Sequence, residues 1–196
     1  DILKDRDRLH LVNAVTFHPY TRYPDARRSA TLRETVRQYA PHIEVFQGEC
    51  GILSTPESFG ALAHPENSEL YQAGWALRRL LTDFAHGIRS SYFAIADMHY
   101  VRDGRLQMNS KGLLATHPDK TVAYAKPAYR AIQHLTALID DRWQPVKADG
   151  SALLAETAFR EACDLHLFAF SPMGNQPRMA AIWIRSADEF SPRKVD

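Results

Sequence analysis

The order of strand-like and helix-like segments constrains the fold of this chain more than any other feature of its sequence. Three short apolar segments have the composition of buried strands, and an amphipathic helical pattern follows each of them. The strand segments are residues 9–17, 43–47 and 91–96. The helical segments are residues 24–39, 68–87 and 126–140. A strand followed by a helix, three times in succession, predicts an α/β fold with a parallel sheet.

Between the third strand segment and the third helical segment, the residues Arg102-Asp103-Gly104-Arg105 predict a tight hairpin turn. An Asp-Gly pair suits a type I′ turn, because both central residues of that turn have a positive φ. We therefore expect two short antiparallel strands within residues 98–123.

The pattern changes after Trp143, where short apolar segments are no longer followed by helical patterns. These segments are residues 152–155, 165–170 and 179–184. Prolines and a Gly174-Asn175 pair separate the last two, as is typical of antiparallel strands. We therefore expect two domains, an α/β domain at residues 1–141 and part of a β-sandwich-like module at residues 142–196.

Composition excludes several classes of partner. The 196 residues include 24 Lys and Arg against 23 Asp and Glu, and this net charge of +1 points neither to nucleic acid nor to an anionic membrane. No apolar run approaches the roughly 20 residues that a membrane-spanning helix needs. The two cysteines are too few for a disulfide framework. The nine histidines are scattered, without a His-x-x-x-His spacing, so we expect no metal site.

Polar groups follow the three strand segments, and in a parallel α/β fold functional side chains lie just beyond the carboxyl ends of strands. The three groups are His18-Pro19-Tyr20, Gly48-Glu49-Cys50-Gly51 and Asp97-Met98-His99-Tyr100. The middle group is the most informative. Glu49 stands near two glycines that permit tight backbone turns, so its carboxylate is well placed to project into a pocket.

These strand ends, in this order, resemble the clan of (β/α)8-barrel retaining glycoside hydrolases, which includes cellulases, mannanases, xylosidases and glucuronidases. The resemblance covers about residues 9–141 and corresponds to the last three of the eight barrel units. In that clan the sixth strand often ends in His-x-Tyr, and the nucleophilic Glu at the end of the seventh strand often stands in a Glu-x-Gly context. Further matching positions are Gln72-Ala73, Arg78 or Arg79, Gly112-Leu113-Leu114 and Lys126-Pro127-Ala128-Tyr129.

The resemblance implies a fold and a set of roles. The fold is the last three units of a TIM (β/α)8 barrel, and the reaction is retaining hydrolysis of a glycan or glycoside. Glu49 would be the nucleophile, and Tyr20 would donate a hydrogen bond that orients it. The residues that would bind the sugar are His18, Asp97, His99 and Tyr100. No cofactor is implied, because proton transfer and covalent catalysis need none.

One element of the clan's pattern does not occur in these 196 residues. The acid/base Glu of the clan follows an Asn at the end of the fourth strand, and the chain contains no Asn-Glu pair. Three units alone would also leave a parallel sheet with unpaired edges. We therefore expect the chain to be the C-terminal part of a longer protein, inactive without an N-terminal barrel segment. The resemblance also favours a secreted or periplasmic location.

Two alternatives stay open at the level of sequence. One is a barrel of the same ancestry that has lost catalysis and only binds a glycan. The other is a different TIM-barrel hydrolase, acting on a phosphate ester or an amide, that uses Glu49 as a base. A cysteine nucleophile at Cys50 fits poorly, because its elbow would need a glycine where Ile52 stands and a helix directly afterwards.

Overall fold

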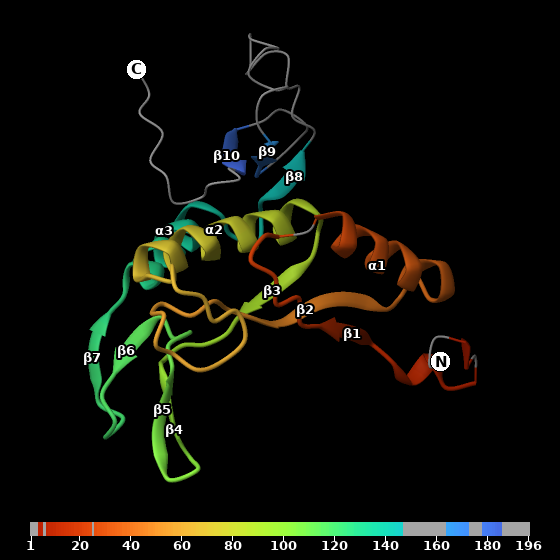
Figure 1. Ribbon diagram of the computed structural model, residues 1–196. Helices are drawn as coiled ribbons and strands as arrows, with labels where there is room; N and C mark the ends of the chain where they lie inside the picture. Colours follow the sequence, from red (N-terminus) through yellow and green to blue (C-terminus); the bar gives the residue numbers. More distant parts are fainter. Residues whose placement is uncertain (1–3, 6, 25, 147–163, 173–177, 186–196) are drawn as a thin grey trace. The chain divides into compact units, whose positions relative to one another are not determined.

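The computed structural model describes residues 4–5, 7–24, 26–146, 164–172 and 178–185 (Figure 1). The chain divides into two compact units, Asp1–Ile139 and Asp140–Asp196. The protein is of the mixed α/β type, and its sheets are small, with two or three strands each. In the described part of the chain, no helix has both the length and the apolar character that crossing a membrane requires.

A three-stranded parallel sheet organises the first unit. Its strands are β1 (Ala14–Phe17), β2 (Glu44–Cys50) and β3 (Arg89–Tyr92), in the order β1-β2-β3. The parallel pairing predicted for the three strand segments is therefore confirmed. The register between β2 and β3 shifts between Gln47 and Cys50, so the irregularity includes the position of Glu49.

Two strands are shorter than the sequence predicts. Leu9–Leu11 forms a turn of 3-10 helix instead of strand, and the buried Leu9 side chain packs beside Val36 and Ile43. The second shortened strand is β3, which ends at Tyr92 although apolar residues continue to Ala96. The backbone there pairs outside the sheet: Ala94 and Ile95 accept hydrogen bonds from Leu113, and Ala96 forms an isolated bridge with Leu114.

Helices α1 (Ala26–Tyr39) and α2 (Glu69–Ala85) connect the strands and cover one face of the sheet (Figure 1). Val36 of α1 is fully buried against Val45 of β2, within one apolar cluster. Helix α2 begins within one residue of the predicted segment 68–87, and the Ser68 hydroxyl caps it by accepting a hydrogen bond from Tyr71 N at 3.1 Å.

The segment after β3 forms two hairpins and a helix. The first hairpin joins β4 (Met98–Arg102) to β5 (Arg105–Asn109), and its central residues have the positive φ values that the sequence predicts, 51° at Asp103 and 70° at Gly104. The second hairpin, which the sequence does not indicate, joins β6 (Leu114–Thr116) to β7 (Val122–Ala125). Helix α3 (Pro127–Leu138) packs beside α2 through a cluster that contains Ala73 and Ala128.

The second unit contains an antiparallel sheet of the order β10-β9-β8. Its strands are β8 (Gln144–Val146), β9 (Asp164–Ser171) and β10 (Met179–Arg185). The antiparallel strands predicted at residues 165–170 and 179–184 are confirmed. The segment predicted at residues 152–155 lies outside the described residues, and β8 forms where the sequence predicts no strand.

Candidate active site

The ends of β1 and β2 bring Tyr20 and Glu49 together. The Tyr20 hydroxyl donates a short hydrogen bond to Oε1 of Glu49. Burial raises the pKa of Tyr20 well above its ordinary value, and the hydrogen bond to the Glu49 carboxylate raises it further. The phenol therefore stays protonated around neutral pH and can donate to Glu49.

His18 stands on the other side of the same carboxylate. Its Nδ1 lies 3.7 Å from Oε2 of Glu49, and its side chain is half exposed. The neighbouring strand leaves room for the imidazole because it carries Gly48: a Cβ at that position would lie 2.5 Å from the Thr16 hydroxyl and 3.3 Å from Nε2 of His18. The glycine before Glu49 is thus required by side-chain packing across β1 and β2.

Lys111 is a component of the site that the sequence analysis does not identify. The side chain is 2% exposed, and its Nζ lies 5.4 Å from the centre of the Tyr20 ring. Burial lowers the pKa of Lys111 to about 8, while the charge of Glu49 acts in the opposite direction. No sequence signal marks this residue, because it follows β5 on a segment far along the chain from β1 and β2.

Asp97, predicted to bind the sugar, lies in a buried ion pair. Its Oδ1 accepts a hydrogen bond from Nζ of Lys126 at 2.7 Å and another from Gly112 N at 2.9 Å. Burial raises the pKa of Asp97, and the Lys126 ammonium opposes that rise. The described contacts of this carboxylate are therefore with the chain itself.

His99 and Tyr100 lie on β4, and their described contacts are on the hairpins. The His99 Nε2 lies 3.0 Å from the carbonyl oxygen of Thr116, and the Thr116 hydroxyl donates to the carbonyl oxygen of Asp97 at 3.0 Å. The Tyr100 hydroxyl donates to the Met98 sulfur, and its ring is exposed. The six predicted residues thus form two groups. Glu49 contacts both His18 and Tyr20, whereas Asp97, His99 and Tyr100 bond to other residues of the segment after β3 and to Lys126.

The segment that carries Tyr20 is tied to helix α2. The buried Arg79 side chain donates to the carbonyl oxygen of Pro19 at 3.2 Å, and Trp75 Nε1 donates to the carbonyl oxygen of Thr21 at 3.1 Å. The Arg79 guanidinium is itself paired with Asp83 at 3.5 Å. These bonds hold the backbone on both sides of Tyr20, so the phenol reaches Glu49 from a rigid support.

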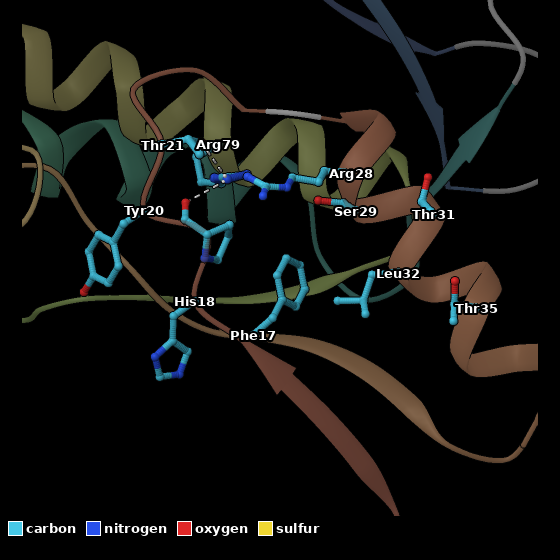
Figure 2. Close-up of a pocket in the computed structure, with 11 residues that line it drawn as sticks. Phe17, His18, Tyr20, Thr21, Arg28, Ser29, Thr31, Leu32, Thr35 and Arg79 are labelled. Atoms are coloured by element: carbon cyan, nitrogen blue, oxygen red, sulfur yellow. Dashed lines mark hydrogen bonds between the residues drawn. The ribbon is translucent and has the colours of Figure 1, made fainter. Parts of the chain in front are cut away.

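A cavity of about 840 Å³ lies between this segment and α1 (Figure 2). Its lining residues are Phe17, His18, Pro19, Tyr20, Thr21, Arg28, Ser29, Thr31, Leu32, Thr35 and Arg79. Figure 2 shows the rings of His18 and Tyr20 pointing away from α1. The cavity is therefore next to the carboxylate site, while Glu49 is not part of its lining.

Cys50 is a structural neighbour of Glu49. Its side chain is buried against Tyr71 and Trp75, and burial raises the pKa of the thiol to about 12. A thiol of that pKa is not nucleophilic near neutral pH. In the part of the chain that the structure describes, no cluster of three metal-ligating side chains occurs.

Of the three comparisons with known proteins, the one with solved structures gives matches. No protein-family model matches the chain, and no curated protein matches it. Among solved structures, a β-glucuronidase of Bifidobacterium dentium complexed with coumarin-3-O-glucuronide is 19% identical, with a TM-score of 0.45, over 66% of this chain and 21% of that one. An FMN-binding β-glucuronidase of Facaelibacterium prausnitzii L2-6 is 15% identical, with a TM-score of 0.46, over 81% of this chain and 24% of that one.

Both of these structural neighbours are β-glucuronidases, and the chain spans a quarter or less of the length of each. Because both TM-scores lie below 0.5, neither neighbour carries weight in assigning a function to this chain.

Proposed function

We propose that this chain is part of a retaining glycoside hydrolase in which Glu49 is the nucleophile. The observation that carries the proposal is the arrangement around that carboxylate: the Tyr20 hydroxyl donates to one oxygen, and the His18 imidazole stands 3.7 Å from the other. A hydrogen-bond donor held on one oxygen stabilises the ionised form and limits rotation of the carboxyl group. Both properties are needed by a carboxylate that attacks carbon.

The reaction has two steps in this proposal. In the first, a Glu49 oxygen forms a bond to the anomeric carbon, the glycosidic bond breaks, and a second carboxyl group gives its proton to the departing oxygen. In the second, that carboxylate takes a proton from water, and the water oxygen displaces Glu49. Tyr20 orients the nucleophile in both steps, and His18 contacts the sugar beside it.

The second carboxyl group lies outside this chain in our proposal. A retaining enzyme needs it about 5 Å from the nucleophile. The described contacts of Glu49 are with a phenol and an imidazole, and neither of these is a carboxyl group. We assign the acid/base to an N-terminal segment that completes a (β/α)8 barrel, of which β1, β2 and β3 would be the sixth, seventh and eighth strands. The order of the three parallel strands, with α1 and α2 on one face, supports this assignment.

Lys111 bears on the class of sugar. In the described part of the chain, no carboxylate lies within ion-pair distance of its ammonium, although the side chain is almost completely buried. A buried cation without a close counter-ion is costly, and a negative group on the substrate would offset that cost. We therefore propose a glycoside whose sugar carries an acidic group.

The test uses the whole protein, with the segment that precedes this chain. We expect it to hydrolyse one of a matched set of nitrophenyl hexosides and hexuronides, and a 2-fluoro glycoside of that sugar to label Glu49 covalently. The label is located by mass spectrometry of peptides. We expect Glu49→Gln to lose the label and at least a thousandfold of kcat.

Glu44→Gln is the matched control, because Glu44 lies on the same strand but is exposed and paired with Arg89. It should keep full activity and labelling at Glu49. A label on another carboxylate, or an active Glu49→Gln variant, would refute the assignment. Binding of the glycoside without any turnover would refute it as well, in favour of a glycan-binding barrel.

A further inference from the structure

Gln72 contacts several backbone carbonyl groups at once. The residue lies on α2 and is completely buried. Its Nε2 lies 3.1 Å from the carbonyl oxygen of Ile52 and within 3.2–3.3 Å of the carbonyl oxygens of Ser110, Lys111 and Gly112. One amide group thus joins the segment after Glu49 to the segment that carries Lys111. We call residues 109–112 the lysine segment.

Lys126, at the start of α3, binds the lysine segment from another direction. Its buried ammonium donates to Asp97 Oδ1 at 2.7 Å, to the Ser54 hydroxyl at 2.9 Å and to the carbonyl oxygen of Ser110 at 3.1 Å. The Ser54 amide in turn donates to the carbonyl oxygen and the hydroxyl of Ser110. The backbone of this segment is thus bonded on the α2 side by Gln72 and on the α3 side by Lys126.

The lysine segment is also enclosed by neighbouring backbone. A Cβ at Gly112 would lie 2.1 Å from the backbone nitrogen of Asp97. A Cβ at Gly60 would lie 2.8 Å from Nζ of Lys111, so the loop after β2 covers the ammonium. The groups with titrating protons that face Lys111 are Tyr20, after β1, and Glu49, at the end of β2. Asp97, after β3, is occupied by Lys126.

We propose that Gln72 is a positioning residue that, by holding the backbone of the lysine segment, keeps the Lys111 ammonium over the Tyr20 ring and beside Glu49. The described hydrogen bonds of Gln72 go to the backbone of Ile52 and of the lysine segment, and none goes to Glu49. We therefore assign its effect on the site to Lys111. Its bearing on catalysis rests on the function proposed above, whereas its effect on Lys111 is a property of the folded chain alone.

The primary test measures the titration of Lys111 directly. In the whole protein labelled with 15N-lysine, the Lys111 side-chain signal is identified by its loss in Lys111→Arg and followed through a pH series. We expect an apparent pKa of about 8 in the wild type. In Gln72→Met, which keeps the length of the side chain but has no N–H donor, the ammonium gains access to water. Its pKa should then rise by about one unit or more, toward the ordinary lysine value.

Two further variants keep the outcome interpretable. Val36→Ala removes buried volume in the α1 cluster and should lower the melting temperature without moving the Lys111 titration. If Gln72→Met does not fold, Gln72→Asn keeps an amide group but withdraws it by one methylene, and should move the titration in the same direction. A folded Gln72 variant in which Lys111 titrates as in the wild type would overturn the proposal.

Activity is the second readout, and it separates this inference from the proposed function. In an active whole protein, Gln72→Met should lower kcat/KM at least tenfold for the acidic glycoside and move the alkaline limb of the pH profile upward. A merely structural role would lower the amount of folded enzyme but leave that limb in place, and this result would also overturn the inference. An inactive protein whose Lys111 titration responds to Gln72 would refute the proposed function and support the inference.

Discussion

At the scale of single residues, the buried Lys111 ammonium is a costly group near Glu49. It is a buried charge that lies 5.4 Å from the centre of the Tyr20 ring and is covered by the loop that contains Gly60. A ring face attracts a cation only weakly compared with the water that burial removes. We interpret this loss of stability as the cost of keeping a positive charge at the site.

That interpretation predicts a stability difference with a defined pH dependence. Burial lowers the pKa of Lys111 to about 8, against roughly 10.4 in an unfolded chain. Between these values the unfolded chain binds more protons, so the destabilisation is complete below pH 8 and disappears as the pH rises toward roughly 10.4. We expect Lys111→Met to be more stable than the wild type by about 2 kcal/mol at neutral pH, with a difference that vanishes at high pH.

Urea unfolding across a pH series measures this difference, with Lys120→Met as the control because Lys120 is exposed. A difference that stays constant with pH would show that Lys111 titrates normally in the folded protein.

The Tyr20 hydroxyl is the second group whose removal should change the reactivity of Glu49. Tyr20→Phe removes one hydrogen bond to a charged acceptor and leaves the ring, so the Lys111 contact is kept. Such a bond is worth about 1.5–3 kcal/mol, and we expect kcat of the whole protein to fall by roughly 10- to 100-fold. Steady-state kinetics would show this, and Tyr129→Phe on α3 should have no effect. Unchanged kcat in Tyr20→Phe would remove Tyr20 from the catalytic machinery.

At the scale of elements, the segments that follow β2 and β3 come into close backbone contact at two glycines. Gly51 follows β2 directly, and a Cβ there would lie 1.7 Å from the carbonyl oxygen of Phe93. A Cβ at Gly112 would likewise lie 2.1 Å from the backbone nitrogen of Asp97, after β3. Because the obstructing atoms are backbone, they cannot move aside as a flexible side chain would. The site depends on these two close approaches, since they bring the lysine segment against the end of β2.

Two glycine substitutions test this packing, one at a close backbone contact and one at an open position on a helix. Gly51→Ala should destabilise the protein by about 3 kcal/mol or more, because the added methyl group overlaps backbone. Gly74→Ala on α2 should stabilise it by up to about 1 kcal/mol, because a Cβ there meets nothing within 4 Å and alanine favours the helix. Chemical denaturation of both variants gives the comparison. A Gly51→Ala variant as stable as the wild type would mean that the two strand exits are not in contact.

At the scale of the whole molecule, the parallel sheet has an edge strand that lacks a second partner. Within the described chain, β1 pairs with β2 alone, and Ala14 and Thr16 are exposed. An open edge of this kind is a template for pairing with another strand. In our proposal the preceding barrel segment occupies that edge in the whole protein.

The 196-residue chain expressed alone should therefore self-associate with increasing concentration. Ala14→Lys places a charge on the edge and should reduce the association, and the whole protein should stay insensitive to concentration. Sedimentation velocity over a concentration series measures all three. A chain that remains monomeric at every concentration would show that the β1 edge is not available.

Several features of the fold could be predicted because they depend on neighbours in sequence. The Ser68 cap of α2 needs only a hydroxyl one residue before the first turn, and the hairpin turn at Asp103-Gly104 needs only two residues that accept positive φ. The contact between Tyr20 and Glu49 was predicted through the family resemblance, which supplied the pairing of two strand ends.

Other features depended on contacts that no local pattern records. Sequence alone determined the succession of strands and helices and placed Glu49 at the end of a strand, because apolar periodicity and turn chemistry act within a few residues. Tertiary structure alone decided that β3 ends early and that Lys111 reaches Tyr20. It also decided that Asp97 is engaged by Lys126. Each of these depends on which distant backbone lies within hydrogen-bond or charge distance, and folding settles that by packing the segments after β2 and β3 together.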